Sequence, residues 1–559
     1  MADTQREIER KFEFTGGQGS GGSSGSRGER ARQGGKTAGK TAGKTAGDAA
    51  GKATAEAAGK ATAEAPGKKG GAGRPRLPDL TGTAGIASVH DRGTARLDAV
   101  YYDTPGLALA ADGLTLRRRT GGEDAGWHLK LPVAPGTRDE VHAPLSDTLP
   151  PDLAALARSR TRRSGLEPQV RLSSERHTRD LLAADGTLLA RLCTDTVRAE
   201  RGPAATAWTE VEVELADGAD PALLDAVTDR FAEAGLRVSD APSKLARALT
   251  ATGAPPPARP GHDPADRTAG AHVLAYVRRQ RDALVAQDPA VRRDLPDSVH
   301  RMRVATRRLR STLATHRKVL DRAATDPVRD ELRWLGAELG ADRDREVLLE
   351  LLRARLGELP PGLRLGPVRD RLRAWNALRR KRTRRRAVAA LDSDRYLALL
   401  DSVDALLAHP PLRPAAARPA TRQLSKAVLR DWDRLADRVG AALALDPGEE
   451  RDRALHEARK AAKRARYAAE AAAPALGGPA RKLAKAAKKV QGLLGDHQDG
   501  VVAREALLGL GAQAADAGES AFTWGLLHGR EEGRSARLEQ RLPAIWAKAA
   551  RRRSKTALK

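Results

Sequence analysis

The chain has 559 residues, and its 99 lysines and arginines exceed its 72 aspartates and glutamates, which gives a formal net charge of +27. The length allows two sizeable cores, and the charge favours a polyanionic partner such as polyphosphate, nucleic acid or an acidic membrane surface. Aromatic residues make up only 3%, which argues against single-stranded nucleic acid because base stacking needs exposed aromatic side chains. Cys193 is the one cysteine, so internal disulfides are excluded and a reducing compartment is expected.

The first predicted element is a strand in which charged and apolar residues alternate. Residues 7–12 read Glu-Ile-Glu-Arg-Lys-Phe, so a strand places Glu7, Glu9 and Lys11 on one face. Two carboxylates beside an ammonium group can bind a metal ion and a phosphate. The same alternation also fits an antiparallel strand with one solvated face, so this strand alone leaves both interpretations open.

Residues 16–73 are mainly glycine, alanine, lysine, threonine and serine, and Gly-Lys-Thr-Ala occurs three times from Gly35. Such a segment has too little apolar surface to offset the entropy of ordering, so we predict a disordered loop. Residues 34–41 match the phosphate-loop pattern Gly-x₄-Gly-Lys-Thr. A functional phosphate loop follows a buried strand and opens a helix, so we interpret the match as an accident of composition.

Further strand-like runs follow, some basic and one acidic. Arg117 and Arg119 share one face of a run at 114–119, and His128 and Lys130 share one face of a run at 127–131. A later run carries three glutamates on one face: Glu210, Glu212 and Glu214. Acidic and basic strands in one sheet predict complementary inner surfaces.

In this order the motifs resemble the CYTH superfamily of triphosphate tunnel metalloenzymes. The resemblance covers roughly residues 1–250 and rests on Glu7-x-Glu9-x-Lys11, Tyr-Tyr-Asp-Thr at 101–104, Leu-Arg-Arg-Arg at 116–119, Lys130 and Glu212-x-Glu214. It implies an eight-stranded antiparallel barrel whose lumen binds a triphosphate together with divalent ions, Mg²⁺ or Mn²⁺. In such a lumen the carboxylates hold the metal, and the basic side chains hold the phosphates.

The resemblance assigns two sets of residues in this sequence. The acids that bind metal and activate water would be Glu7, Glu9, Glu212 and Glu214, with Lys11 beside them in the catalytic set and Glu210 as a weaker candidate. The phosphate clamp would be Lys11, Arg117, Arg119, Lys130, Arg176 and Lys244, with Arg191 and Glu140 matching less securely. These residue types suit phosphoryl transfer to water, because positioned cations neutralise developing charge and a carboxylate can deprotonate the water.

A linker rich in proline and glycine at residues 254–268 predicts a domain boundary. From residue 269 onward alanine, leucine and arginine recur at helical spacing, so we expect only helices. Basic residues recur at offsets +3, +7, +8 and +10 from both His300 and His456, and residues 339–344 align without gaps on 494–499. We therefore predict two copies of one helical unit.

The basic residues of each copy form a stripe that borders an apolar stripe. His300, Arg303 and Arg307 fall on one side of a helix, and Val299 and Met302 lie beside them instead of opposite. A charge run is most often a solvated face. A row of cations at a helix packing seam, however, is costly unless an anion neutralises it, so the repeated stripe favours an anion-binding role.

These helices resemble the CHAD domain, and the match covers roughly residues 269–545. The resemblance implies a helical bundle of two pseudo-symmetric halves that binds inorganic polyphosphate through basic residues carried over as His300, Arg303, Arg307, Arg310, His456, Arg459, Lys463, Arg464 and Arg466. His497 corresponds to Asp342 in the first copy. A metal site made of His497 and Asp499 is an alternative to the favoured capping or packing role.

We therefore expect an α+β multidomain protein with an antiparallel β tunnel at 1–253, a linker at 254–268, an all-α bundle of two pseudo-repeats at 269–545 and a basic tail at 546–559. The predicted function is metal-dependent hydrolysis of inorganic triphosphate coupled to polyphosphate binding. The alternatives are an organic-triphosphate hydrolase or adenylate cyclase of the same fold, and a non-catalytic polyphosphate or nucleic-acid binder. Without an apolar signal segment or a stretch near the about 18 residues of a membrane helix, we expect a cytoplasmic protein that could gather at polyphosphate granules.

Overall fold

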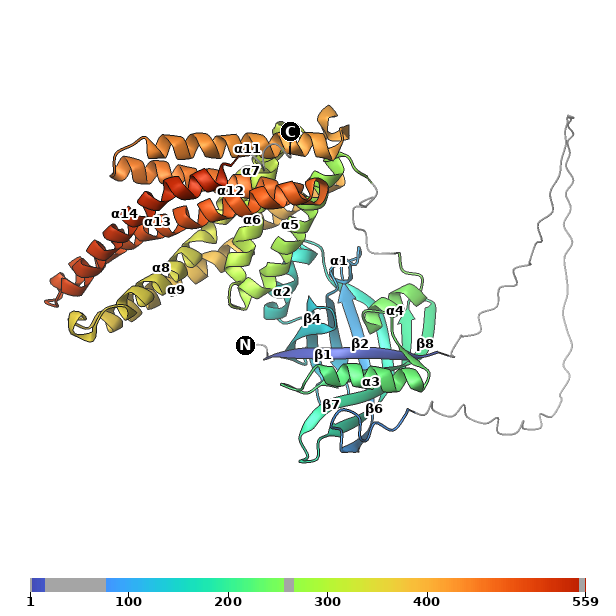
Figure 1. The fold of residues 1–559 in the computed structure, drawn as a ribbon. Coiled ribbons are helices and arrows are strands. Elements are labelled where there is room, and N and C mark those ends of the chain that lie inside the picture. Colours follow the sequence, from blue (N-terminus) through green and yellow to red (C-terminus); the bar gives the residue numbers. More distant parts are fainter. Residues whose placement is uncertain (1–2, 16–76, 256–265, 552–557, 559) are drawn as a thin grey trace, which may run out of the picture.

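The structure is a computed structural model that describes residues 3–15, 77–255, 266–551 and 558. Figure 1 shows a β-rich N-terminal domain beside a larger helical domain. The predicted insertion at 16–73, with its repeats and its phosphate-loop match, lies outside the described residues. So do residues 256–265 of the predicted linker and residues 552–557 and 559 of the predicted tail.

The N-terminal domain is a ring of eight antiparallel strands, as predicted. The strands are β1 (Asp3–Phe14), β2 (Ser88–Asp103), β3 (Thr115–Thr120), β4 (Gly126–Ala134), β5 (Thr137–Pro144), β6 (Glu167–Leu182), β7 (Leu188–Arg201) and β8 (Ala204–Leu215). Their order is β5-β4-β3-β2-β6-β7-β8-β1, and β1 also pairs with β5, which closes the ring. A short ninth strand that the sequence did not suggest, β9 (Leu236–Val238), pairs with the end of β1.

Strand β1 closes the ring by changing partners along its length. Its residues 3–8 pair with β5, and its residues 9–12 pair with β8. The predicted alternation holds, since Glu7, Glu9 and Lys11 face the lumen while Phe12 is buried outside it. Phe12 packs edge-on against Phe231, with ring centroids 4.8 Å apart. Burying such an aromatic side chain contributes about 2–3 kcal/mol, which ties β1 to the helix behind it.

In the described part of the N-terminal domain, four helices surround the barrel: α1 (Ala108–Ala111), α2 (Pro151–Thr161), α3 (Ala222–Glu233) and α4 (Lys244–Ala251). Helix α3 packs its apolar residues on the outer face of β1 and β8, and α2 covers the outer face of β3 to β5. Helix α4 begins with Ser243 as its N-cap, whose Oγ accepts a hydrogen bond from the amide of Ala246. This start places Lys244 at the edge of the lumen.

The described part of the C-terminal domain contains helices and no strand longer than an isolated bridge. They are α5 (Ala269–Arg292), α6 (Ser298–Thr315), α7 (Arg322–Glu338), α8 (Gly340–Gly357), η1 (Pro361–Leu363), α9 (Val368–Asp392), α10 (Asp394–Ala408), η2 (Pro414–Ala417), α11 (Ala420–Leu443), α12 (Glu449–Leu476), α13 (Gly478–Asp516) and α14 (Phe522–Ala549). Among the described helices, none has the length and apolar character that crossing a bilayer requires.

Equivalent contacts in the two halves of the bundle support the predicted duplication. In the first half Arg303 of α6 donates hydrogen bonds to the carbonyl of Gly340 and to Asp344 of α8. In the second half Arg459 of α12 lies 3.7 Å from the Asp499 carboxylate of α13. The aligned segments therefore place an arginine of one helix against an aspartate of the next in both copies.

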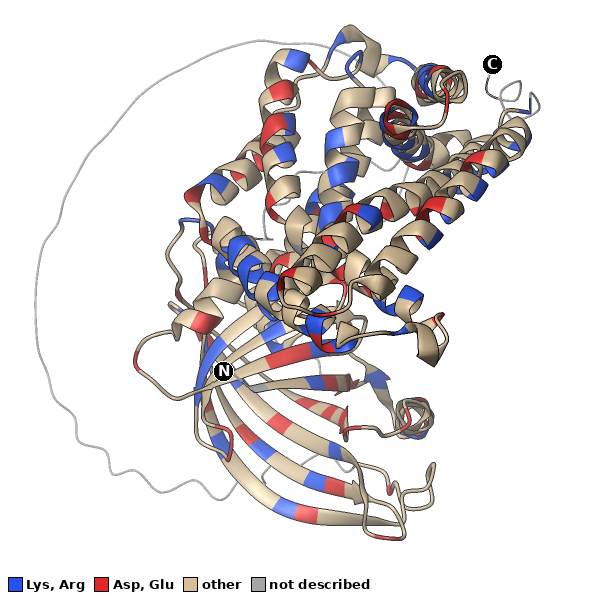
Figure 2. Cartoon of the chain, turned by 90° about the vertical axis from the view of Figure 1, so that its left-hand side faces the viewer, with Lys and Arg blue, Asp and Glu red and all other residues tan. Residues whose placement is uncertain are grey.

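Ion pairs join the barrel to the bundle, which Figure 2 shows directly above the strands. Arg162 of the α2 C-cap pairs with Asp404 of α10 at 2.9 Å. Arg293, just after α5, pairs at 2.9 Å with Asp139 of β5, which is 4% exposed. These ion pairs connect α2 and β5 of the barrel domain to the helical domain.

Candidate functional site

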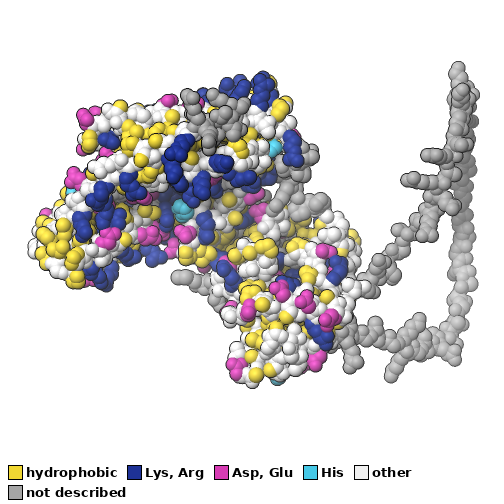
Figure 3. All heavy atoms as spheres, viewed as in Figure 1, with side chains coloured by type: hydrophobic (Ala, Val, Ile, Leu, Met, Phe, Trp, Pro, Cys, Tyr) yellow, Lys and Arg dark blue, Asp and Glu magenta, His cyan; other side chains and the backbone are white. Residues whose placement is uncertain are grey.

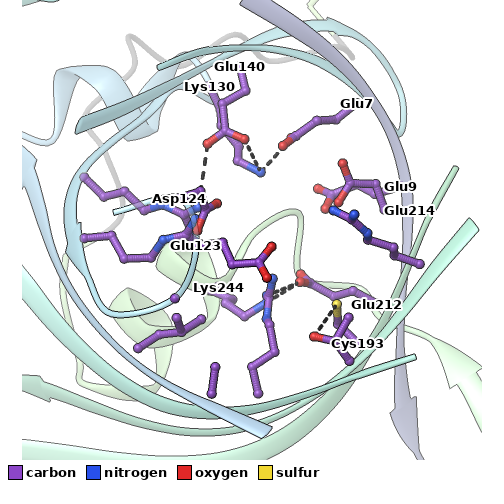
Figure 4. A pocket seen from close by; sticks show the side chains of 18 of the residues that line it. Glu7, Glu9, Glu123, Asp124, Lys130, Glu140, Cys193, Glu212, Glu214 and Lys244 are labelled. Atoms are coloured by element: carbon purple, nitrogen blue, oxygen red, sulfur yellow. Dashed lines mark hydrogen bonds and ion pairs between the residues drawn. The ribbon is translucent and has the colours of Figure 1, made fainter. Parts of the chain in front are cut away.

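The barrel encloses a cavity of about 440 Å³, and charged side chains from several strands point into it (Figure 4). The firm sequence-predicted tunnel residues and the less secure Arg191 and Glu140 all line this cavity: Glu7, Glu9, Lys11, Arg117, Arg119, Lys130, Glu140, Arg176, Arg191, Glu212, Glu214 and Lys244. The weaker candidate Glu210 is buried beside the cavity, where it contacts Lys244 at 2.6 Å and accepts a hydrogen bond from Trp208.

Glu9 and Glu214 form the acidic part of the lumen. They lie opposite each other in the register of β1 and β8, and Figure 4 shows their carboxylates side by side. Glu9 lies 3.1 Å from Lys11, whereas Glu214 has no hydrogen bond or ion pair among the described residues. Burial raises the pKa of Glu214, and Glu9 adds to the increase. Glu9 also lies 3.6 Å from Arg138, and although burial opposes it, Lys11 and Lys130 lower the pKa of Glu9. Glu214 is therefore the carboxylate of the two that lacks a counter-charge, and together they offer the oxygen ligands that a hard divalent cation such as Mg²⁺ or Mn²⁺ prefers.

Lys130 connects two further carboxylates across the lumen. Its Nζ donates a hydrogen bond to Glu7 at 2.6 Å and lies 3.5 Å from Glu140. Burial and a hydrogen bond with Glu140 raise the pKa of Glu7 to about 8. Although burial opposes it, Lys130 lowers the pKa of Glu140. At neutral pH Glu7 therefore carries a proton and Glu140 does not.

Glu212 organises the basic wall of the lumen. It contacts Lys11, accepts a hydrogen bond from Arg176 at 3.0 Å and lies 2.6 Å from the Nζ of Lys244. Lys244 occupies the space between three buried carboxylates that are close enough to share a metal ion: Asp195, Glu210 and Glu212. Because the ammonium group of Lys244 already compensates these acids, they fit a metal ion less well than Glu214, which has no ion pair among the described residues.

Two arginines of β3 lie in the lumen with incomplete hydrogen bonding. The Nε atoms of Arg117 and Arg119 are buried and have no hydrogen-bond partner among the described residues. Burial, together with repulsion from Arg117 and Arg176, lowers the pKa of Arg119 to about 9. Arg117 lies 3.6 Å from Glu140, and Arg119 contacts Asp124, so each arginine has a carboxylate nearby. An anion bound between them would supply the hydrogen-bond acceptors that their Nε atoms lack.

The sequence analysis missed Arg138 and Asp195. Arg138 precedes Glu140 by two residues in β5, so the strand period would have placed it in the lumen. Asp195 lies below the lumen, 3.0 Å from Lys244, and this contact depends on where α4 begins. Arg191 lies at the mouth of the cavity, since its side chain is 53% exposed.

A second group of basic side chains gathers where α6 packs against α12, and Figure 3 shows lysines and arginines in a band across the helical domain. We call it the α6–α12 cluster, and it consists of His300, Arg303, Arg307, Arg310, Arg459 and Lys463. Arg303, Arg307 and Arg459 are close enough to Lys463 to repel its charge. Burial and these neighbours lower the pKa of Lys463 to about 7.

The α6–α12 cluster has few acidic partners. Among the described residues, Arg307, Arg310 and Lys463 form no ion pair or hydrogen bond, and the buried Nε of Arg307 lacks a partner. Arg303 and Arg459 each have one aspartate nearby. Half-buried cations without counter-charges are costly, so the cluster has the charge and geometry of an anion-binding surface.

The other predicted polyphosphate-binding residues lie apart from the cluster. Arg464 contacts the buried Asp431 of α11 at 3.0 Å, and Arg466 donates a hydrogen bond to Glu470 at 2.6 Å. His456 is hydrogen-bonded to Gln498. These side chains therefore already have partners within the bundle.

His497 and Asp499 do not share a site. The buried Nε2 of His497 lies 3.0 Å from Glu539 and 3.4 Å from Asp452, and these three could together hold a metal ion. Both acids also pair with arginines, Arg451 and Arg504. These paired charges connect α12, α13 and α14.

Comparisons with known proteins agree with this architecture. A CYTH domain model matches residues 80–249, and a CHAD domain model matches residues 275–508. Two curated relatives come from Mycobacterium tuberculosis, "Uncharacterized protein MT2285" of strain CDC 1551 / Oshkosh and "Uncharacterized protein Rv2226" of strain ATCC 25618 / H37Rv. Each is 39% identical over 507 residues, which cover 84% of this chain and 93% of the relative.

Two solved structures also match parts of the chain. PptA from Streptomyces chartreusis is 26% identical, with a TM-score of 0.42, and covers 50% of this chain and 99% of its own. The CHAD domain from the plant Ricinus communis is 27% identical, with a TM-score of 0.41, and covers 54% of this chain and 98% of its own.

The chain therefore belongs to the proteins in which a CYTH domain precedes a CHAD domain, as the motifs predicted. The CYTH family comprises triphosphate tunnel enzymes that typically use divalent metals. The CYTH match begins at residue 80, so it omits β1 although β1 completes the ring and carries Glu7, Glu9 and Lys11.

Proposed function

We propose that the barrel hydrolyses inorganic triphosphate with a divalent metal ion and that the helical domain binds inorganic polyphosphate. The observation that carries the first part is the division of the lumen into an acidic side and a basic side. On the acidic side Glu214, beside Glu9, has no ion pair among the described residues, and on the basic side the buried Nε atoms of Arg117 and Arg119 lack hydrogen-bond acceptors. A triphosphate with its metal ion supplies what each side lacks.

Within this proposal the residues have separable tasks. Glu9 and Glu214 would hold Mg²⁺ or Mn²⁺, which when bound neutralises charge on the phosphate oxygens. Arg117 and Arg119 would donate hydrogen bonds to those oxygens and hold the triphosphate in place. Glu7, which accepts a hydrogen bond from Lys130 at 2.6 Å, would hold the Lys130 ammonium group in the lumen beside the phosphates.

The lining of the cavity favours an inorganic substrate over a nucleotide or thiamine triphosphate. Among the described residues, Tyr101 is the aromatic side chain that lines it, and its hydroxyl lies 3.4 Å from Arg117. The apolar lining is limited to Ala95, Leu97 and Cys193. A nucleobase would require an apolar or aromatic surface to stack on. ATP should therefore compete poorly with tripolyphosphate.

Phosphate release from tripolyphosphate, with and without Mg²⁺ or Mn²⁺, tests the hydrolytic part. Metal-dependent release by the wild type that falls at least about a hundredfold in Glu9→Gln and Glu212→Gln, roughly 2.7 kcal/mol of barrier, supports a hydrolase. Absence of release with either metal, while polyphosphate still binds, would make this a binding protein with a repurposed barrel. Faster release from ATP than from tripolyphosphate would favour the organic-triphosphate alternative.

The binding part of the proposal is carried by the absence of ion pairs at Arg307, Arg310 and Lys463 within the described structure. A nucleic acid could also neutralise these cations, so competition between polyphosphate and duplex DNA at matched salt and equal phosphate concentration decides between them. Displacement of polyphosphate by DNA would end the polyphosphate assignment. A cytoplasmic location, at or near polyphosphate granules, belongs to the same proposal.

A further inference from the structure

A run of basic residues on α9 belongs to neither proposed site. Residues 379–386 read Arg-Arg-Lys-Arg-Thr-Arg-Arg-Arg and contain no acid. Lys381, Arg382 and Arg385 are exposed and form no hydrogen bond or ion pair among the described residues. Like charges three and four positions apart on a helix repel each other. These three side chains therefore stabilise nothing within the fold.

The other side of α9 fixes this run at the junction between the domains. Arg380 forms an ion pair with Asp294 at 2.7 Å. Arg293, which precedes Asp294 in the chain, pairs with Asp139 of β5. The two neighbours of Asp139 in β5, Arg138 and Glu140, line the tunnel cavity. In Figure 2 the helices directly above the barrel strands carry many lysine and arginine positions. Because Arg138 and Glu140 point into the lumen, Asp139 points outward, so these contacts connect α9 through the loop after α5 to the outer face of β5.

The residues between α5 and α6, which include Asp294, also lead toward the α6–α12 cluster. Helix α6 begins at Ser298, shortly after Asp294, and carries His300 in its first turn. Arg343 of α8 is close enough to His300 to lower its pKa together with burial. Arg343 also lies 3.7 Å from Asp297, so it extends the basic surface of the α6–α12 cluster toward the residues between α5 and α6.

We propose that Lys381, Arg382 and Arg385 hold a segment of an inorganic polyphosphate chain between the α6–α12 cluster and the tunnel, so that the bundle presents chain ends to the barrel. This inference rests on the proposed functions of both sites. The ligand class follows from chemistry, because exposed cations without interleaved aromatic side chains contact phosphate groups and do not stack bases. In the proposed function the lumen takes up the three phosphates of tripolyphosphate, so contact with α9 concerns the further phosphates of longer chains.

The test compares two full-length triple variants that remove the same charge. In the first, Lys381, Arg382 and Arg385 are each replaced by Gln. In the second, the exposed and unpaired α13 lysines Lys482, Lys485 and Lys489 are replaced by Gln. Two quantities are measured for each protein: kcat/KM for phosphate release from tripolyphosphate and from chains of about a hundred phosphates, and the salt dependence of long-chain binding.

For the α9 variant we expect tripolyphosphate hydrolysis within about twofold of wild type, long-chain hydrolysis lowered about tenfold, and a binding slope against log salt reduced by about 2 to 3. The α13 variant should change none of these. Equal effects of both variants would show a net-charge effect and overturn the proposal. So would unchanged long-chain binding by the α9 variant.

Failure of the proposed function has a different signature. If the wild type releases no phosphate from tripolyphosphate, the hydrolytic role of the barrel is wrong. The binding comparison between the two variants still decides whether α9 holds polyphosphate. If the wild type does not bind polyphosphate at all, both the binding role of the bundle and the α9 inference are overturned.

Discussion

Glu214 faces Glu9 from the neighbouring strand of the barrel, and Glu214 has no hydrogen bond or ion pair within the described residues. The other lumen carboxylates differ from it, since Glu7 pairs with Lys130 and Glu212 contacts three cations. The position opposite Glu9 is therefore the part of the lumen where an added cation is most favourable.

Replacing Glu214 by Gln should weaken metal binding and slow triphosphate hydrolysis by about a hundredfold or more. The reason is that Glu9 alone offers one carboxylate where two are needed. Metal titrations of phosphate release at saturating tripolyphosphate measure the effect. The matched control is Glu200→Gln, an exposed carboxylate of β7 that pairs with Arg198 outside the cavity. A Glu214→Gln protein with unchanged metal dependence would contradict the assignment.

Replacing Lys244 by Met should destabilise the barrel by about 3–5 kcal/mol, because it leaves a group of buried carboxylates without their ammonium partner. Urea unfolding measures the loss. The acids that Lys244 joins are close enough to share a metal ion, so Mn²⁺ should stabilise the variant more than the wild type. Lys488→Met, at an exposed unpaired lysine of α13, is the control. If the Lys244→Met and Lys488→Met proteins unfold at the same urea concentration, Lys244 does not stabilise the barrel.

Polyphosphate binding should become weaker as the pH rises above 7. Lys463 has a pKa of about 7 in the free protein, against an ordinary value of 10.5, so its amine is neutral above pH 7. A bound polyanion favours the ammonium form and raises the pKa again. Binding then takes up a proton between these two values, and affinity falls through that window while it is independent of Lys463 at lower pH.

Calorimetric titration in buffers of different ionisation enthalpy measures this proton uptake. Lys463→Arg is the most direct control, because arginine stays charged throughout this pH range. The variant should bind polyphosphate at pH 9 with the affinity that the wild type shows at pH 6. Proton uptake that persists in Lys463→Arg would assign the pH dependence to another group.

Arg307 and Arg464 should respond oppositely to replacement by Gln. Arg307 has no partner among the described residues, so Arg307→Gln should lower polyphosphate affinity several-fold, by about 1 kcal/mol, without loss of stability. Arg464 compensates the buried Asp431, so Arg464→Gln should reduce the free energy of unfolding by about 1–3 kcal/mol. Filter binding and urea unfolding separate the two effects. Equal loss of affinity without destabilisation in both variants would refute the distinction.

Local periodicity was sufficient to predict which strand residues share the lumen. The period of two assigned Glu7 and Lys130 correctly, since it does not depend on which strands are neighbours. It could not show that Glu210, on the same face as Glu212, is covered by Lys244. That contact depends on the start of α4, which comes from a distant part of the chain.

The helical half shows the same limit. The stripe on α6 and α12 predicted that Arg307 and Lys463 lie beside a packing seam, and both are half-buried at the contact between these helices. The offsets that the two copies share also included Arg464, which faces α11. Offsets fix an angle on one helix, but the neighbour at that angle is set by the packing of the whole bundle.

The change of partners along β1 has a consequence for how the protein assembles during translation. β1 leaves the ribosome well before β5 and β8, between which it closes the ring. At elongation rates of about 5–20 residues per second, roughly 10–40 s separate the synthesis of Glu9 from that of Glu214. Until then two strand edges stay open and the lumen does not exist. A bulky fusion next to Asp3 should therefore lower the yield of closed barrels while leaving the activity of each closed barrel unchanged.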